Sequence, residues 1–215
     1  MVISNIYIRQ SRRWTSTFLL AMLLLLITAA SPARAEDKPR DSRWAQPVAL
    51  PQADNFYRVT PNLYRAAQPD AQAFREYESF GIKTVINLRA NHSDKKKLAQ
   101  TGLKLIEVPI DTWSLDDGEV IAVLRHIRNE PGPILVHCQH GADRTGTIMA
   151  MYRIIFQGWS REEALDEMIN GGYGYHSIWT NLPKYIRGAD LNRIRAVLGC
   201  PPSGACAPQA KVKPK

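Results

Sequence analysis

The sequence predicts a single α/β domain with a central, mostly parallel sheet flanked by helices. The chain has 215 residues, of which 45% are hydrophobic and 22% charged, an ordinary composition for a globular protein. Short runs of β-branched residues alternate with helical patterns along most of the chain, which is typical of βα units. The alternation contains no internal repeat.

Each predicted element follows from its apolar spacing and from the residues that end it. We expect strands in short apolar or β-branched runs: 57–64 (broken at Pro61), 83–88, 103–109 and 134–137. We expect helices where apolar residues recur every three or four positions or a capping pattern occurs: 70–79 (ended by Gly81), 91–100, 119–130, 145–157, 160–170, 178–187 and 189–198. The stretch 111–117 is predicted to be a loop.

The positive charge of the chain lies mainly at its two ends. Of the formal net charge of +8, residues 1–35 contribute +4 and the last five residues +3, which leaves +1 for the rest. A nucleic-acid-binding surface needs basic residues clustered on the folded domain. The sequence therefore predicts no nucleic-acid partner.

The N-terminus has the pattern of a secretory signal peptide. A basic stretch precedes the apolar run Phe18–Ala30, and the small residues of Ala33-x-Ala35 follow it. The alternative is an uncleaved membrane anchor, but the apolar run is shorter than the ~20 residues needed to cross a bilayer. We therefore expect cleavage after Ala35, a periplasmic mature protein and no stable membrane insertion.

The mature chain is expected to hold one domain between two irregular segments. Residues 36–56 are rich in Pro, Asp, Arg and Gln without periodicity, which predicts a linker or extended arm. The domain is predicted over 57–199, and residues 200–215 form a predicted C-terminal tail. In an exported protein, Cys200 and Cys206 of this tail are expected to pair, which leaves Cys138 as an unpaired thiol.

The unpaired cysteine lies in the most informative stretch of the sequence, HCQHGADRTG. Cys138 ends a predicted apolar strand, and five residues separate it from Arg144, which opens a predicted long helix. Gly141 permits a tight turn between them. This order wraps a loop around a helix N-terminus, where several backbone N–H groups converge. Such a concavity binds a tetrahedral dianion.

Each part of this stretch has a use in the hydrolysis of phosphate esters. A helix N-terminus and a nearby arginine stabilise a cysteine thiolate, which can attack phosphorus and form a phosphocysteine. Arg144 can hold two phosphate oxygens and stabilise the equatorial oxygens of the transition state. Thr145 can donate its hydroxyl to the departing thiolate in the second step. An inert buried cysteine beside a surface arginine would leave the exported thiol unexplained.

HCQHGADRTG resembles the active-site loop of the cysteine-dependent protein tyrosine phosphatases, in their compact dual-specificity branch. Residues 63–69 (LYRAAQP) resemble that family's opening segment, and 151–153 with 157–159 resemble its bacterial members. The resemblance implies the fold of that family and an enzyme without metal or other cofactor, with Cys138 as nucleophile and Arg144 as phosphate ligand. It also implies that a run of loop residues binds the substrate phosphate: Gln139, His140, Gly141, Ala142, Asp143, Arg144 and Thr145.

The sequence offers four candidates for the general acid. In the family that the loop resembles, an aspartate on a mobile upstream loop protonates the leaving oxygen. The candidates are Asp111, Asp116 and Asp117, with Asp143 inside the loop as a fourth. Asp116 suits a helix N-cap, because a glutamate follows three residues later. Asp111 follows a strand end and has no capping role that the sequence reveals, so it is the preferred acid.

The histidines lack metal-ligand spacing, and we expect none of the five to bind a metal: His92, His126, His137, His140 and His176. His137 is expected to support the loop instead. The stretch 171–176 is interpreted either as a wall of the substrate pocket or as a turn that ends a helix.

The expected substrate is a protein that contains phosphotyrosine. The alternatives are an inositol-phosphate phosphatase on the same fold, an inactive phosphate-binding module and a persulfide-carrying sulfurtransferase. Polyanionic rings require added positive charge, whereas residues 139–143 contain no lysine or arginine and one aspartate. The intact Cys138 and Arg144 argue against an inactive module. A sulfurtransferase has no evident need for the Arg-Thr-Gly helix start.

Overall fold

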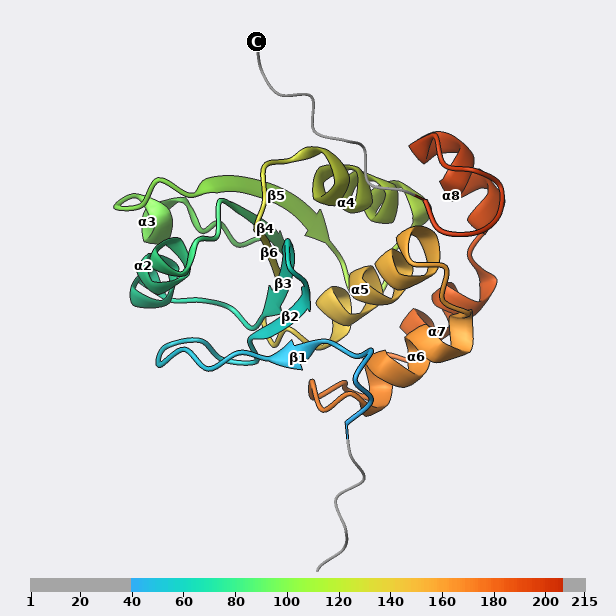
Figure 1. The fold of residues 1–215 in the computed structure, drawn as a ribbon, viewed down its shortest axis with the longest axis horizontal. Helices are drawn as coiled ribbons and strands as arrows, with labels where there is room; N and C mark the ends of the chain where they lie inside the picture. The colour runs from blue at the N-terminus through green and yellow to red at the C-terminus, as the bar shows by residue number, and fades with distance from the viewer. Residues whose placement is uncertain (1–39, 207–215) are drawn as a thin grey trace, which may run out of the picture. The chain divides into compact units, whose positions relative to one another are not determined.

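The predicted parallel strands form the centre of a mixed sheet. In the computed structural model, which describes residues 40–206, the strands are β1 (Gln46–Pro47), β2 (Tyr57–Thr60), β3 (Leu63–Ala66), β4 (Thr84–Arg89), β5 (Lys104–Ile110) and β6 (Ile134–His137). Their order in the sheet is β1-β2-β3-β6-β4-β5 (Figure 1). β3, β6, β4 and β5 are parallel, and β1 and β2 extend one edge antiparallel. The predicted fold class is confirmed.

The helices of the described residues follow the strands in alternation. They are α2 (Ala71–Phe80), α3 (Lys95–Leu98), α4 (Asp117–Asn129), α5 (Asp143–Phe156), α6 (Arg161–Asn170), α7 (Asn181–Gly188) and α8 (Leu191–Leu198). The predicted caps are present: the side chain of Asp70 accepts a hydrogen bond at the start of α2, and Asp116 and Ser160 form capping boxes on α4 and α6.

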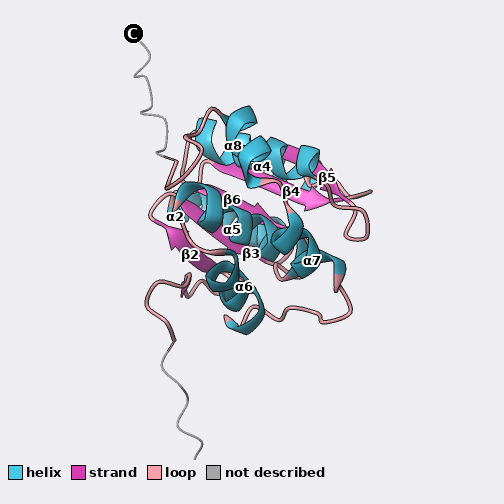
Figure 2. Ribbon diagram, turned by 90° about the vertical axis from the view of Figure 1, so that its right-hand side faces the viewer, coloured by secondary structure: helices cyan, strands magenta, loops and turns pink. Residues whose placement is uncertain are grey.

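Helices cover both faces of the sheet. α2 and α3 lie on one face, and α4 to α8 lie on the other (Figures 1 and 2). Neighbouring strand residues point to opposite faces, so Leu135 packs with Phe74 beneath α2, whereas Val136 packs with Ile148 of α5. These two hydrophobic clusters fix the position of β6, whose carboxyl end carries the candidate site.

Two predicted elements differ from the structure. The single strand predicted over 57–64 is a hairpin of β2 and β3, because the chain reverses at Pro61 and Asn62. The helix predicted over 91–100 is reduced to the four residues of α3. Asn91 has a left-handed backbone (φ 55°), and the Asp94 side chain makes no capping hydrogen bond because other parts of the domain engage it.

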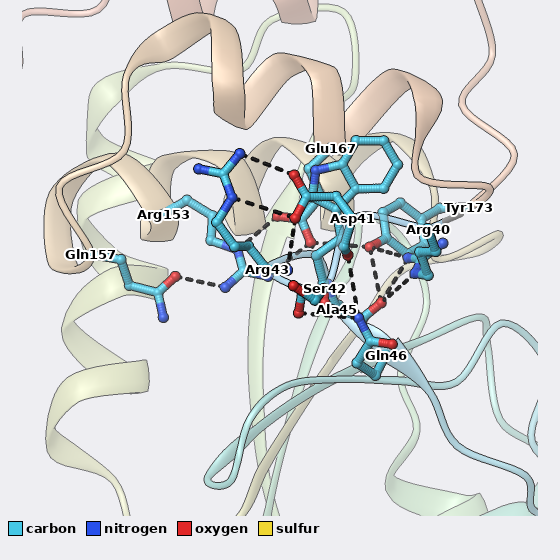
Figure 3. Close-up of polar contacts among 11 residues, drawn as sticks. Arg40, Asp41, Ser42, Arg43, Ala45, Gln46, Arg153, Gln157, Glu167 and Tyr173 are labelled. Carbon is cyan, nitrogen blue, oxygen red and sulfur yellow. Dashed lines mark hydrogen bonds and ion pairs between the residues drawn. The ribbon is translucent and has the colours of Figure 1, made fainter. Parts of the chain in front are cut away.

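The segment predicted as a linker or extended arm packs onto the domain from Arg40 onward (Figure 3). The Arg40 guanidinium donates to the Tyr173 hydroxyl (2.7 Å), and the Ala45 N–H donates to the Glu167 carboxylate (2.6 Å). The same carboxylate forms a buried pair with Arg153 (2.6 Å). These contacts join residues far apart in the sequence and leave no periodic pattern, so the predicted boundary at residue 57 lies too late.

The C-terminal boundary also moves. Cys200 and Cys206 form a disulfide, as expected for an exported chain, and Cys138 is the one free cysteine of the three. Cys206 is buried, and its N–H donates to the Ile155 carbonyl (3.1 Å), so residues 200–206 belong to the domain rather than to a tail.

The predicted signal peptide, residues 1–35, lies outside the described residues, and so does the end of the predicted tail, 207–215. Among residues 40–206, no helix has both the length and the apolar character to span a bilayer.

Candidate active site

The site lies at the carboxyl end of β6, where the chain turns into α5. Cys138 follows the last residue of β6 directly and is 1% exposed, and α5 begins at Asp143. Sites in α/β sheets lie beyond the carboxyl ends of parallel strands. The residues between this strand and this helix, 138–144, are called the phosphate loop below.

The turn of the phosphate loop requires glycine at position 141. Gly141 has φ +70°, and a Cβ added there would lie 2.4 Å from the Ala66 carbonyl oxygen at the end of β3. A side chain would therefore meet backbone as well as the steric penalty of the left-handed region. The close approach explains why the loop curls back over the sheet at this residue.

Three successive carbonyls of the phosphate loop are held from outside it. The Gln68 N–H donates to the carbonyl of Gln139 (3.0 Å), the Asn55 side-chain amide to that of His140 (2.7 Å), and the Arg65 guanidinium to that of Gly141 (2.5 Å). Among residues 40–206, no residue accepts a hydrogen bond from the backbone N–H groups of 139–144. These three carbonyl groups are thus engaged, whereas the N–H groups of 139–144 remain available to a ligand.

Two polar side chains at the start of α5 add to these donors. Arg144 is half-buried, and its guanidinium donates to the Ile110 carbonyl at the end of β5 (3.4 Å). Arg144 Nε and the fully buried Thr145 hydroxyl have no hydrogen-bond partner within the described part of the chain. Buried polar atoms are normally paired, so the arrangement suits a bound oxyanion beside Cys138.

His137 supports the phosphate loop from behind, as the sequence predicts. Its ring is fully buried, with Nδ1 3.2 Å from the Cys138 carbonyl oxygen and Nε2 3.1 Å from the Asp94 carboxylate. Gln68 donates to the other oxygen of that carboxylate (2.7 Å). Burial raises the pKa of Asp94, but the interactions with His137 and Gln68 outweigh burial, and the net shift is downward.

Arg65 is a supporting residue that sequence reasoning missed. Its side chain is 1% exposed, and its guanidinium lies 3.6 Å from the centre of the Tyr173 ring while it donates to Gly141. Burial lowers the pKa of Arg65, and the nearby Tyr173 and Glu167 oppose that shift. The only signal in the sequence was its place within LYRAAQP.

Three of the four candidate acids are engaged in structural contacts. Asp116 caps α4 through the N–H groups of Gly118 and Glu119, as expected. Asp117 accepts a hydrogen bond from the Tyr185 hydroxyl (2.8 Å), and Asp143 accepts from His176. Their carboxylates are therefore oriented toward neighbours.

Asp111, the preferred candidate, is exposed and directly follows the residue that contacts Arg144. Its carboxylate accepts one local hydrogen bond, from the Trp113 N–H (3.0 Å), which is a turn contact that the sequence did not reveal. Burial, and then the carboxylates of Asp116 and Asp111, raise the pKa of Glu119, so the loop 111–117 concentrates acidic groups. Of the four candidates, Asp111 is the one on the strand end beside Arg144.

Aromatic side chains lie on two segments that adjoin the site, 111–117 and 171–180. Trp113 is 66% exposed, and its ring centre lies 4.4 Å from that of Trp179. The Asn181 amide donates to the Thr112 carbonyl (2.7 Å), which joins the loop 111–117 to the start of α7, directly after the segment 171–180. Gly171 ends α6, which confirms the interpretation of 171–176 as a helix-ending turn. His176 reaches Asp143 of the phosphate loop, and a role as a wall of the substrate pocket stays a prediction. We call the segments 111–117 and 171–180 the rim.

Three groups that can ligate a metal ion also meet at this edge. Ligand atoms of His140, Asp143 and His176 all lie within 4.8 Å of one another. Local spacing could not indicate this cluster, because His176 comes from a separate segment. The expectation that no histidine binds a metal rests on spacing along the chain and takes no account of such a cluster.

Fold and loop together define a chain of the cysteine-dependent phosphatase class, and comparison with known proteins identifies the branch. A family model described as "Polymorphic toxin system, DSP-PTPase phosphatase" matches residues 59–158. The dual specificity protein phosphatase TpbA of Pseudomonas aeruginosa (strain UCBPP-PA14) is 37% identical over 194 residues, which cover 88% of this chain and 86% of TpbA. The chain belongs to the dual specificity protein phosphatase family of TpbA.

Solved structures agree with this assignment. A crystal structure of a cysteine-to-serine variant of P. aeruginosa TpbA in complex with pTyr has 37% identity and a TM-score of 0.68, over 75% of this chain and 99% of that one. The core catalytic domain of the PP-IP phosphatase SIW14 from S. cerevisiae shares the fold, with 23% identity and a TM-score of 0.61 over 70% of this chain and 94% of that one. An inositol diphosphatase of Arabidopsis thaliana, DSP5, is 29% identical over 53% of this chain and 59% of its own.

Proposed function

We infer that the protein hydrolyses phosphotyrosine in protein substrates through a phosphocysteine intermediate, without a metal ion. The Cys138 thiolate attacks phosphorus, a bond forms between sulfur and phosphorus, and the bond from phosphorus to the tyrosine oxygen breaks. Asp111 gives its proton to that oxygen, so tyrosine leaves as the neutral phenol. Water then attacks the phosphocysteine, releases inorganic phosphate and returns the thiolate.

The single observation that carries this proposal is the orientation of the phosphate loop. The carbonyls of three successive residues point outward to Gln68, Asn55 and Arg65, while the N–H groups of 139–144 have no acceptor among residues 40–206. Preorganised donors at the place where charge develops are the main source of electrostatic catalysis. They supply, with Arg144, the positive potential that a metal ion supplies in other phosphatases.

The buried Thr145 hydroxyl has a role in the second step. It lies in the first turn of α5 and has no partner in the described part of the chain. A hydroxyl that donates to the departing thiolate stabilises the charge that returns to sulfur when the phosphorus–sulfur bond breaks.

The site favours an aryl phosphate over a polyanionic ring. The interior of the phosphate loop carries one negative and no fixed positive side chain, and the adjoining rim presents Trp113 and Trp179. Aromatic side chains pack well against a tyrosine ring, whereas several phosphate groups would need added cations. Hydrolysis of inositol phosphates is the second candidate, because DSP5 and SIW14 are described as acting on such molecules.

Two features of the chain support a place of action outside the cytoplasm. The signal-peptide pattern ending at Ala35 and the disulfide between Cys200 and Cys206 are both typical of oxidising compartments. The proposed location is the periplasm, and the proposed partner is a phosphotyrosine protein there.

A side-by-side assay tests this function. Purified protein, with chelator and reductant present, is given phosphotyrosine peptides, phosphoserine peptides and inositol phosphates. We expect tyrosine to be preferred and the activity to survive chelation. Loss of activity on chelation would contradict the metal-free mechanism. Faster release of phosphate from inositol phosphates would contradict the preference for phosphotyrosine and favour the second candidate.

The rim variant Trp113→Ala sharpens the assay. Its KM for phosphotyrosine peptides should rise by about two- to tenfold, as for the loss of one aromatic contact worth ~0.5–1.5 kcal/mol. Hydrolysis of a small aliphatic phosphate should be unchanged. Tyr152→Ala, which removes a ring on another part of the molecule, is the matched control, and an equal rise there would contradict a role for the rim.

A further inference from the structure

His140, Asp143 and His176 form a ligand cluster that the proposed reaction does not use. His140 lies within the phosphate loop, Asp143 begins α5, and His176 lies on the rim segment 171–180. The ring centres of the two histidines are 4.9 Å apart, and one ligand atom from each of the three residues lies within 4.8 Å of the other two. Ligand atoms of a tetrahedral zinc site lie roughly 3.3–3.5 Å apart, so these three atoms must come closer together, by up to roughly 1.5 Å, to share one ion.

The Asp143 carboxylate is oriented as a ligating carboxylate is. The residue is 5% exposed, and its Oδ1 accepts the backbone N–H of His176 (2.9 Å). Its Oδ2 lies 2.9 Å from His176 Nδ1. A carboxylate whose second oxygen is held by an outer hydrogen bond presents its first oxygen to a metal in a fixed direction.

The two segments that carry the histidines are held together by a third residue. The Asn55 side-chain amide donates to the His140 carbonyl (2.7 Å) and to the Tyr173 carbonyl (2.9 Å). Asn55 itself has a left-handed backbone, φ 53°, which asparagine tolerates better than most residues. The ligands therefore lie on segments that are already joined, and the exposed side chains of His140 and His176 can move to close the remaining gap.

We propose that His140, Asp143 and His176 bind one Zn²⁺ and that the bound ion inhibits the phosphatase reversibly. Two imidazoles and a carboxylate suit Zn²⁺, whereas Mg²⁺ and Ca²⁺ prefer oxygen ligands alone. Three protein ligands leave a fourth position open. Zinc there ties the phosphate loop to the rim, and its open position retains the phosphate product, so turnover falls.

Zinc binding is measured first, by isothermal titration calorimetry on the full chain carrying Cys138→Ser, so that the thiol cannot ligate the ion. We expect one Zn²⁺ per chain. Adding His140→Ala or His176→Ala should each weaken the affinity by at least about tenfold, as loss of a ligand or its support does. His126→Ala is the matched control, because it removes another imidazole that faces a carboxylate, that of Glu130 (3.3 Å); its affinity should be unchanged.

Three results would overturn the site: no binding of zinc alone, unchanged affinity in both cluster variants, or an equal loss in His126→Ala. The His140 side chain is exposed, so its removal is not expected to unfold the domain, and circular dichroism checks both variants.

Inhibition is measured on the protein with Cys138 intact. Zinc should slow the hydrolysis of an aryl phosphate, chelator should restore it, and His176→Ala should need about tenfold more zinc for the same effect. Equal sensitivity of the parent and His176→Ala would contradict inhibition through this site. Because the calorimetry uses an inactive variant, the zinc site and the proposed phosphatase function can fail separately.

Discussion

The phosphate loop and the rim differ in how they are held. The loop is buried at Cys138 and fixed at three successive carbonyls by Gln68, Asn55 and Arg65. The rim is exposed at Asp111 and Trp113, and the Asn181 amide joins the loop 111–117 to the start of α7, directly after the segment 171–180. The proposed phosphate-binding centre is therefore held at more points than the exposed rim, which is proposed to meet the rest of the substrate.

This contrast separates two tasks. A phosphoryl group has the same shape in every substrate, so a fixed set of donors serves all of them. The leaving group varies, and protonating it requires an acid that approaches after binding. Changes in the loop should therefore affect every phosphate ester alike, whereas changes in the rim should depend on the leaving group.

The largest effect is expected from Cys138→Ser. Serine lacks the acidity to attack as an anion at neutral pH, so turnover of all phosphate esters should fall to background. Phosphate should still bind, because Arg144 and the loop N–H groups remain. Calorimetry with inorganic phosphate and an assay with two different esters check both points, and residual turnover of either ester would contradict the assignment of the nucleophile.

Asp111→Asn tests the rim, and the loss of activity that it causes should depend on the leaving group. Phosphotyrosine hydrolysis should slow by ~10²–10⁴-fold, because the phenolate is a poor leaving group, and an activated aryl phosphate should be affected much less. The basic limb of the pH–rate profile should flatten as well.

Asp116→Asn is the control for this variant, because that side chain caps α4. It should change the unfolding free energy little, because asparagine caps a helix about as well as aspartate does, and it should show no leaving-group effect. If Asp117→Asn or Asp143→Asn shows the dependence instead, the acid is misassigned.

Gly141→Ala tests the loop and should be insensitive to the leaving group. The added Cβ would meet the Ala66 carbonyl at 2.4 Å, and the left-handed backbone adds a strain of ~1–2 kcal/mol. The loop must shift, so kcat/KM should fall by ~10–100-fold for phosphotyrosine and for the activated ester together. Gly174→Ala, also at positive φ but with no atom within 4 Å of an added Cβ, separates the clash from the strain. Equal defects in the two variants would contradict the importance of the close approach.

An effect mainly on stability rather than on turnover is expected from Asp94→Asn, behind the loop. The pKa of Asp94 is lowered in the folded protein, so its ionised form stabilises the fold above the ordinary value of 3.8. The variant should lose ~1–3 kcal/mol at neutral pH. This difference should shrink as the pH falls below 3.8, first because Asp94 of the unfolded parent chain takes up a proton and then, below the lowered pKa, because the folded parent does as well. Urea unfolding at several pH values measures it, and a difference independent of pH would contradict the ionic role.

The sequence predicts the loop better than the rim for a physical reason. Cys138, Gly141 and Arg144 are contiguous, and their strand–turn–helix context is visible in local apolar spacing. Asn55, Arg65 and His176 act across the fold, and only packing of the sheet brings them to the site. Asn55 lay within the segment interpreted as a linker, since long-range contacts such as that of Ala45 with Glu167 leave no local pattern.

The secondary structure follows the same rule. Capped helices such as α4 and α6 were predicted with their caps, because Asp116 and Ser160 act on residues three positions away. The helix predicted over 91–100 was too long, since Asp94 is buried by His137 and Gln68 rather than used as a cap. Tertiary contacts override local preference there.

The covalent step is tested most directly by trapping the intermediate. The protein is mixed with an activated aryl phosphate, for which hydrolysis of the phosphocysteine is slower than its formation. The reaction is quenched in acid within the first turnovers. Peptide mass spectrometry should then find one phosphoryl group, on the peptide that contains Cys138, and none in Cys138→Ser. A burst of phenol release without protein-bound phosphate, or a phosphoryl group on another residue such as His140, would contradict the phosphocysteine mechanism.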